Sequence, residues 1–135
     1  MGNPFCHIEL ATGDTGIASN FYKKLFTWKL AKMPMGGSTY TIIDMGMKDA
    51  GGGIMGKMMP EQPTAWMPYV LVDSVKKSVA KAAKLGARVI VPYQEIQGHG
   101  ACGIFTDPTG ATIGVYEAIK KAPAKKKAAK KKGKK

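Results

Sequence analysis

The feature that most constrains the fold is an internal repeat of about 60 residues. In each half of residues 3–118, an extended segment leads into a helical one, and three more extended segments follow. A shift of 60 residues places Leu10 on Val70 and Leu25 on Leu85, so the elements match although few residues are identical. The sequence therefore predicts two tandem β-α-β-β-β modules, at about residues 3–60 and 61–118.

Capping and periodicity locate the elements of the first module. Asp14 is a predicted N-cap, and the apolar residues Ile17, Phe21 and Leu25 then recur every four positions, as on one face of a helix. The strands that flank this helix are rich in β-branched and aromatic residues or in glycine. We expect them at residues 5–11, 28–30, 39–43 and 50–58.

The second module repeats this order with clearer boundaries. Asp73 or Ser74 caps a helix that ends at Gly86. Residues 107–110 (Asp-Pro-Thr-Gly) are a strong turn signal, which predicts that the last two strands form a hairpin. We expect the strands at residues 68–72, 88–91, 101–106 and 111–116.

These elements predict an α+β fold in which the two modules form one curved mixed sheet around a cavity. Each module has a sheet with one face covered by its helix and the other face bare. Side by side, the two bare faces can curve into a trough, which is a natural place for a small molecule.

The positive charge of the chain is concentrated at one end. The formal net charge is +12, from 21 basic and 9 acidic residues. Residues 120–135 hold ten lysines and no acid, which leaves the rest of the chain with 11 basic and 9 acidic residues. We expect residues 119–135 to be a disordered basic tail that could bind nucleic acid or another polyanion without sequence preference.

Other broad classes are excluded by composition. The longest apolar stretch, residues 65–72, is interrupted by Pro68 and is too short for a membrane span. The N-terminal residues lack the basic and apolar regions of a signal peptide, so we expect a cytoplasmic protein. Cys6 and Cys102 match no zinc or redox motif, and we expect both to be buried free thiols.

Three sequence segments, in this order, resemble the vicinal oxygen chelate superfamily, the group of glyoxalase I, bleomycin resistance proteins and extradiol dioxygenases. The segments are Cys6-His7-Ile8-Glu9-Leu10, Phe21-Tyr22-Lys23-Lys24-Leu25-Phe26-Thr27-Trp28 and Asp107-Pro108-Thr109-Gly110-Ala111. The resemblance covers nearly all of residues 3–118 and implies paired β-α-β-β-β modules that line a cavity. It also implies that such domains pair into a homodimer.

The resemblance implies metal ligands on the first and last strand of each module, of which this sequence retains one. His7 stands at the first ligand position, but the repeat places Met67 at its counterpart, and Gly114 stands where a Glu is expected. The matching strand of the first module offers Gly52, Gly53 and Met55. A thioether cannot replace imidazole or carboxylate for a hard divalent ion, so we predict no catalytic metal and no cofactor.

Strand alternation places His7 and Glu9 on the face that lines the trough. We expect this pair to be the catalytic groups if the protein is an enzyme, and the substrate-binding wall to consist of Met55, Met67, Tyr69 and Tyr116. Our first hypothesis is a metal-independent domain that binds a small organic molecule. The alternatives are a glyoxalase-related lyase or isomerase in which His7 and Glu9 transfer a proton, and nucleic-acid association by the tail.

Overall fold

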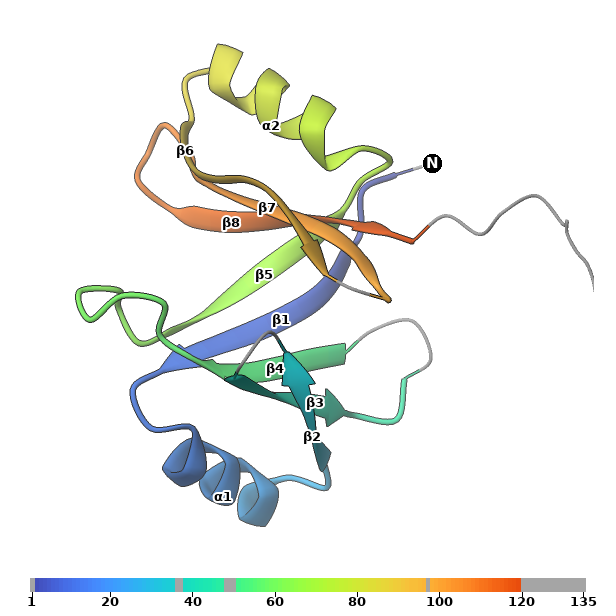
Figure 1. Ribbon diagram of the computed structural model, residues 1–135, viewed down its shortest axis with the longest axis vertical. Helices are drawn as coiled ribbons and strands as arrows, with labels where there is room; N and C mark the ends of the chain where they lie inside the picture. Colours follow the sequence, from blue (N-terminus) through green and yellow to red (C-terminus); the bar gives the residue numbers. More distant parts are fainter. Residues whose placement is uncertain (1, 36–37, 48–50, 97, 120–135) are drawn as a thin grey trace, which may run out of the picture.

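The computed structural model shows one eight-stranded sheet that curves between two helices (Figure 1). It describes residues 2–35, 38–47, 51–96 and 98–119. In chain order the elements are β1 (Phe5–Thr12), α1 (Thr15–Leu25), β2 (Lys29–Met35), β3 (Ser38–Asp44), β4 (Gly51–Gly56), β5 (Ala65–Leu71), α2 (Val75–Lys84), β6 (Arg88–Ile96), β7 (Gly100–Thr106) and β8 (Thr112–Ala118). The predicted α+β fold class is confirmed.

The sheet consists of two four-stranded halves with the same internal order. Its strand order is β2-β3-β4-β1-β5-β8-β7-β6, so the first strand of each module lies at the centre of the sheet. In each half the first and last strands are parallel, as β1 and β4 are, whereas β1 and β5 join the two halves in an antiparallel pair. The register of this central pair places Glu9 opposite Met67 and His7 opposite Tyr69.

Side-chain caps begin both helices. The Ile17 N–H donates to Oδ1 of Asp14 (2.9 Å), as predicted. Of the two residues predicted for α2, Ser74 is the N-cap, because its Oγ accepts from the Lys77 N–H. Glu117 of β8 accepts a further hydrogen bond from the Val75 N–H (2.7 Å), so a carboxylate lies at the positive end of the helix dipole.

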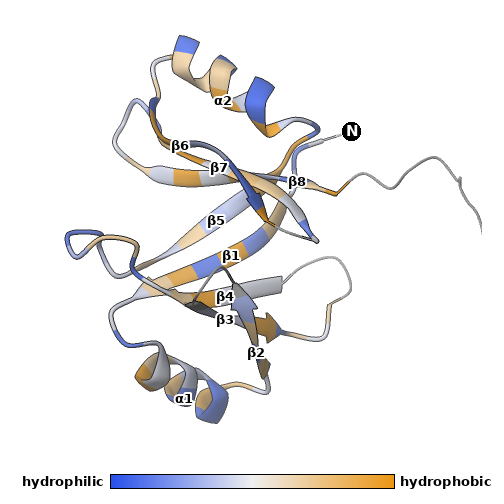
Figure 2. Cartoon of the chain, viewed as in Figure 1, coloured by the Kyte–Doolittle hydropathy of each residue, from blue (hydrophilic) through white to orange (hydrophobic). Residues whose placement is uncertain are grey.

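Each helix covers the outer face of its own half of the sheet and encloses a small core (Figure 1). Leu10, Ile43 and Ile54 form the buried cluster on the α1 side, and Val75, Val79 and Val115 form the cluster on the α2 side. Hydrophilic and hydrophobic residues alternate along β1, because its two faces meet the helix side and the inner side of the sheet (Figure 2).

Strand β6 extends further than the sequence predicts. The sequence predicts a strand over residues 88–91, and the next residue, Pro92, has no backbone N–H to donate to a neighbouring strand. The strand continues to Ile96 because it lies at the edge of the sheet, and its register with β7 shifts between Val89 and Val91 and again between Val91 and Gln94. These irregularities carry the chain past the proline.

The basic tail falls almost wholly outside the described residues, which end at Ile119, so its disorder and its binding to polyanions stay predictions. The backbone N–H of Ile119 donates to the carbonyl of His99 (2.8 Å). Among the described helices, none is both long and apolar enough to cross a membrane.

Shortening Ile54 should destabilise the fold more than the same change at Ile8. Ile54 is fully buried, so Ile54→Ala leaves a cavity and should cost about 2–5 kcal/mol in the free energy of unfolding. Ile8 is 43% exposed and lies in the adjacent strand, so Ile8→Ala should cost less than half as much. Urea unfolding measures both, and equal losses would contradict the placement of the core.

Candidate functional site

A cavity of about 740 Å³ lies against the inner face of the curved sheet. All eight strands contribute residues to its lining, and neither helix does. Most of its wall is apolar, and the strand residues that provide that wall include Met33, Ile42, Met55, Leu71, Ile96 and Ile104. The predicted cavity between the two modules is therefore present.

Glu9 is the one carboxylate among the described residues of the lining, and two tyrosines donate hydrogen bonds to it. The Tyr40 hydroxyl donates to Oε2 of Glu9 (2.8 Å), and the Tyr69 hydroxyl donates to Oε1 (3.1 Å). The two tyrosines come from β3 and β5, on either side of β1, and both are buried. Each carboxylate oxygen thus has a fixed donor, which orients Glu9 toward the cavity.

His7 joins this group through Tyr40. Its Nε2 lies 2.7 Å from the Tyr40 hydroxyl oxygen. Because Tyr40 has one hydroxyl proton and gives it to Glu9, Nε2 of His7 must carry the proton that it shares with Tyr40. In neutral His7 this leaves Nδ1 as an acceptor, and the side chains form a directed chain from His7 through Tyr40 to Glu9.

Burial shifts the pKa of His7, Glu9 and the two tyrosines, in each case in the direction that favours the uncharged side chain. Burial raises the pKa of Glu9, and the hydrogen bonds from Tyr40 and Tyr69 partly oppose that shift. Burial also lowers the pKa of His7. The pKa values of both tyrosines are raised strongly, by burial first and then by the charge of Glu9. The tyrosines therefore stay protonated and remain donors at neutral pH.

Two glycines make room for these tyrosine rings. A β-carbon on Gly53 would overlap the ring and hydroxyl of Tyr40, and a β-carbon on Gly114 would overlap the ring of Tyr69. Gly53 lies in β4 and Gly114 in β8, the last strand of each module. Each ring thus occupies the space above the backbone that a side chain would otherwise fill.

The residues present do not fit the metal site that the resemblance implies. Ligand side chains on the last strands would need the space that Tyr40 and Tyr69 occupy over Gly53 and Gly114. His7 has no imidazole or carboxylate at its repeat counterpart, which is Met67. Across the described part of the chain, no three His, Cys, Asp or Glu residues are placed to hold a metal ion.

Both cysteines are free thiols in the cavity lining. Cys102 is buried as expected, whereas Cys6 is only half-buried. Burial, with a smaller contribution from the charge of Glu9, raises the pKa of Cys102 to about 11. Burial also raises the pKa of Cys6. Both thiols are therefore protonated at neutral pH, which makes them poor nucleophiles.

The structure brings five of the six predicted site residues into the cavity lining. These are His7, Glu9, Met55, Tyr69 and Tyr116. The sixth, Met67, is half-buried opposite Glu9 in the β1–β5 pair and is not among the residues that line the cavity.

Sequence reasoning missed Tyr40, which holds Glu9 and contacts His7. The sequence contains a signal that could have identified it, because Tyr40 is the one aromatic residue in the strand predicted at residues 39–43.

The part of the cavity wall formed by Gln94, Ile96 and His99 was also missed, because it depends on the irregular end of β6 and the loop after it. The Tyr116 hydroxyl donates to the His99 carbonyl (2.7 Å) and so ties this loop to β8.

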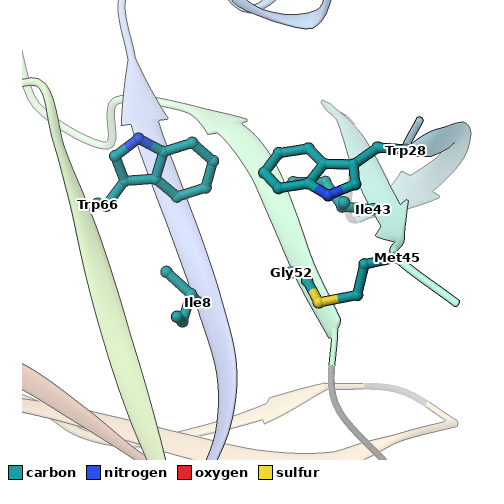
Figure 3. Close-up of a pocket in the computed structure, with 6 residues that line it drawn as sticks. All are labelled: Ile8, Trp28, Ile43, Met45, Gly52 and Trp66. Carbon is teal, nitrogen blue, oxygen red and sulfur yellow. The ribbon is translucent and has the colours of Figure 1, made fainter. Parts of the chain in front are cut away.

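A second, smaller pocket of about 180 Å³ lies on the opposite face of the central strands (Figure 3). The indole rings of Trp28 and Trp66 lie across from one another above Ile8. The lining of this pocket consists of Ile8, Trp28, Ile43, Met45, Gly52 and Trp66. None of these side chains titrates, whereas the lining of the larger cavity includes His7, Glu9 and both cysteines.

Comparison of sequences relates the chain to two curated proteins, although no family model matches it. A Mycobacterium bovis protein named "Putative glyoxylase CFP32" is 34% identical over 115 residues, which cover 82% of this chain and 44% of that protein. The protein of the same name from Mycobacterium tuberculosis matches to the same extent. The chain thus spans less than half the length of these relatives.

Comparison of structures finds the same fold in proteins of low sequence identity. The hypothetical protein BH1468 from Bacillus halodurans has a TM-score of 0.69 at 14% identity, over 92% of this chain and 100% of that one. Methylmalonyl-CoA epimerase from Mycobacterium tuberculosis has a TM-score of 0.66 at 13% identity, over 86% of this chain and 88% of that one. A variant of the Streptomyces coelicolor epimerase, in complex with 2-nitronate-propionyl-CoA, has a TM-score of 0.67 at 10% identity, over 89% and 98% of the two chains. The chain thus has the fold that its resemblance to the vicinal oxygen chelate superfamily implies, and it shares sequence with the proteins named "Putative glyoxylase CFP32".

Proposed function

We propose that this chain is a metal-independent, glyoxalase-like domain that binds a small organic molecule in the cavity between its two modules. The observation that carries the proposal is one oriented carboxylate, Glu9, in a cavity of about 740 Å³ with mostly apolar walls. Binding sites for small molecules commonly enclose about 300–1,000 Å³ and combine apolar walls with a few fixed polar groups.

Metal independence is supported by how the tyrosines are seated. Tyr40 and Tyr69 fill the space over Gly53 and Gly114 and direct their hydroxyls to Glu9. A site built in this way binds its ligand by hydrogen bonds and apolar contact. The epimerase neighbours are named for methylmalonyl-CoA, and one of them holds a CoA compound, which supports a small-molecule role for the fold without naming the ligand of this chain.

An uncharged apolar probe should bind in the cavity without metal. N-phenyl-1-naphthylamine should become more fluorescent on titration with the protein, and EDTA should leave its Kd unchanged. Ile42→Trp places an indole in the cavity lining and should weaken binding about tenfold or more. Ile8→Trp is the matched control, because Ile8 is 43% exposed and Ile42 37%, but Ile8 lies on the opposite face.

The reverse pattern would contradict the proposal. If Ile8→Trp weakened binding and Ile42→Trp did not, the probe would lie in the outer pocket of Figure 3. Loss of binding in EDTA, restored by a divalent metal, would remove the claim of metal independence.

Adding one methyl group at Gly114 should displace the ring of Tyr69 and destabilise the fold. Gly114→Ala places a β-carbon against the ring of Tyr69, and such overpacking should cost about 1–3 kcal/mol in the free energy of unfolding. Gly56→Ala is the control, since a β-carbon there meets nothing within 4 Å. Urea unfolding compares the two, and a neutral Gly114→Ala would show that Tyr69 does not depend on this glycine.

A second candidate function is proton transfer, as in a lyase or isomerase related to glyoxalase. The chain from His7 through Tyr40 to Glu9 favours it, because the chain orients the carboxylate and can deliver a proton to Glu9 after Glu9 has given one up. In the reaction tested below, the Glu9 carboxylate takes a proton from the carbon beside a carbonyl. The C–H electron pair moves into the enolate, with negative charge on the carbonyl oxygen. The proton on Glu9 exchanges with D₂O, and Glu9 then gives a deuteron to the carbon as the carbonyl re-forms.

If this candidate is correct, the protein should speed hydrogen exchange of 4-phenyl-2-butanone in D₂O. Glu9→Gln removes the base and should slow the catalysed exchange about 10²-fold or more. Glu95→Gln removes an exposed carboxylate outside the cavity lining and should leave the rate unchanged. NMR follows the loss of the α-proton signals. Exchange no faster than in buffer would contradict the hypothesis that the protein transfers a proton from this ketone.

A further inference from the structure

We infer that the ligand of this cavity is an apolar organic cation, in which an aromatic or aliphatic body carries one protonated amine, and that Glu9 is its counter-ion. The inference rests on the proposed function, because it names the class of ligand for the same cavity. It follows from which charges line the cavity, which acceptor sites remain on Glu9, and what surrounds them.

Among the residues that the structure describes, those that line the cavity include one carboxylate and neither lysine nor arginine. Its basic groups are two imidazoles, His7 and His99. His7 is itself kept uncharged by burial, which lowers its pKa. A bound anion would therefore face Glu9 without a fixed positive partner, whereas a bound cation would meet no like charge from His7.

Glu9 retains room for another donor. Tyr40 and Tyr69 use one acceptor site on each carboxylate oxygen, and an ionised carboxylate offers about four such sites. A buried carboxylate without a positive partner is costly, and hydrogen bonds alone offset only part of that cost. An ammonium group that donates to Glu9 would supply both the missing charge and the missing donors.

The surroundings of Glu9 also suit an organic cation. The rings of His7, Tyr40 and Tyr69 lie close together, with the His7 centroid 6.3 Å from that of Tyr40 and 5.7 Å from that of Tyr69. Aromatic ring faces attract ammonium groups, and this attraction strengthens when water is excluded. The thioethers of Met33 and Met55 provide polarizable wall for the apolar part of the molecule.

Three probes of similar shape and different charge test the inference. Calorimetric titration at pH 7 should rank 2-phenylethylamine, a cation, above 2-phenylethanol, and should rank phenylacetate, an anion, last. We expect the amine to bind about tenfold or more tightly than phenylacetate. Glu9→Gln should remove this preference, whereas Glu95→Gln, which removes the same charge outside the lining, should preserve it.

The outcomes separate this inference from the proposed function. If phenylacetate bound as tightly as the amine, or if the amine preference survived Glu9→Gln, the cation inference would be wrong while binding in the cavity stood. If N-phenyl-1-naphthylamine and all three probes failed to bind, the proposed function would be wrong as well. The ranking with the unmodified protein decides the question even if Glu9→Gln fails to fold.

Discussion

The antiparallel pairing of β1 with β5 is the contact on which the rest of the structure depends. It joins the two half-sheets, each of which has a helix on only one of its faces. It also places the first strand of both modules at the centre of the sheet. The same register sets Tyr69 beside His7 and brings its hydroxyl to Glu9. One strand pair therefore builds the sheet and the polar centre of the cavity together.

The glycines of β4 and β8 explain how this centre differs from the metal site that the superfamily resemblance implies. Gly53 and Gly114 carry no side chain, and the rings of Tyr40 and Tyr69 lie in the space that this leaves. The two tyrosines direct their hydroxyls to Glu9, which is not at one of the implied ligand positions. Both glycines lie in the last strand of a module, whereas Tyr40 comes from β3 of the first module and Tyr69 from β5 of the second.

Sequence reasoning reached the fold and three of the four side chains of the polar centre, His7, Glu9 and Tyr69, for identifiable reasons. Local signals such as helix caps depend on a few adjacent residues, so the pattern alone located the cap at Asp14 and limited the second cap to Asp73 or Ser74. Alternation along a single strand placed His7 and Glu9 on one face in the same way.

Tyr40 was missed because its role depends on where β3 lies relative to β1, with β4 between them. Alternation also failed to distinguish Met67 from Tyr69. The two residues are on the same side of β5, but Tyr69 lines the cavity and Met67 does not. Position along the trough is a property of sheet curvature, and curvature depends on twist and register across all eight strands.

The charge of the chain and the charge of the cavity have opposite signs, and they act at different distances. The net charge of +12 belongs mostly to residues 120–135, and salt at physiological strength screens its field beyond about 8 Å. Glu9 acts over hydrogen-bond distance inside an apolar enclosure, where screening by water is weak. Our inference therefore assigns the ligand preference of the cavity to one carboxylate and its two tyrosines, which act at contact distance, rather than to the net charge of the chain.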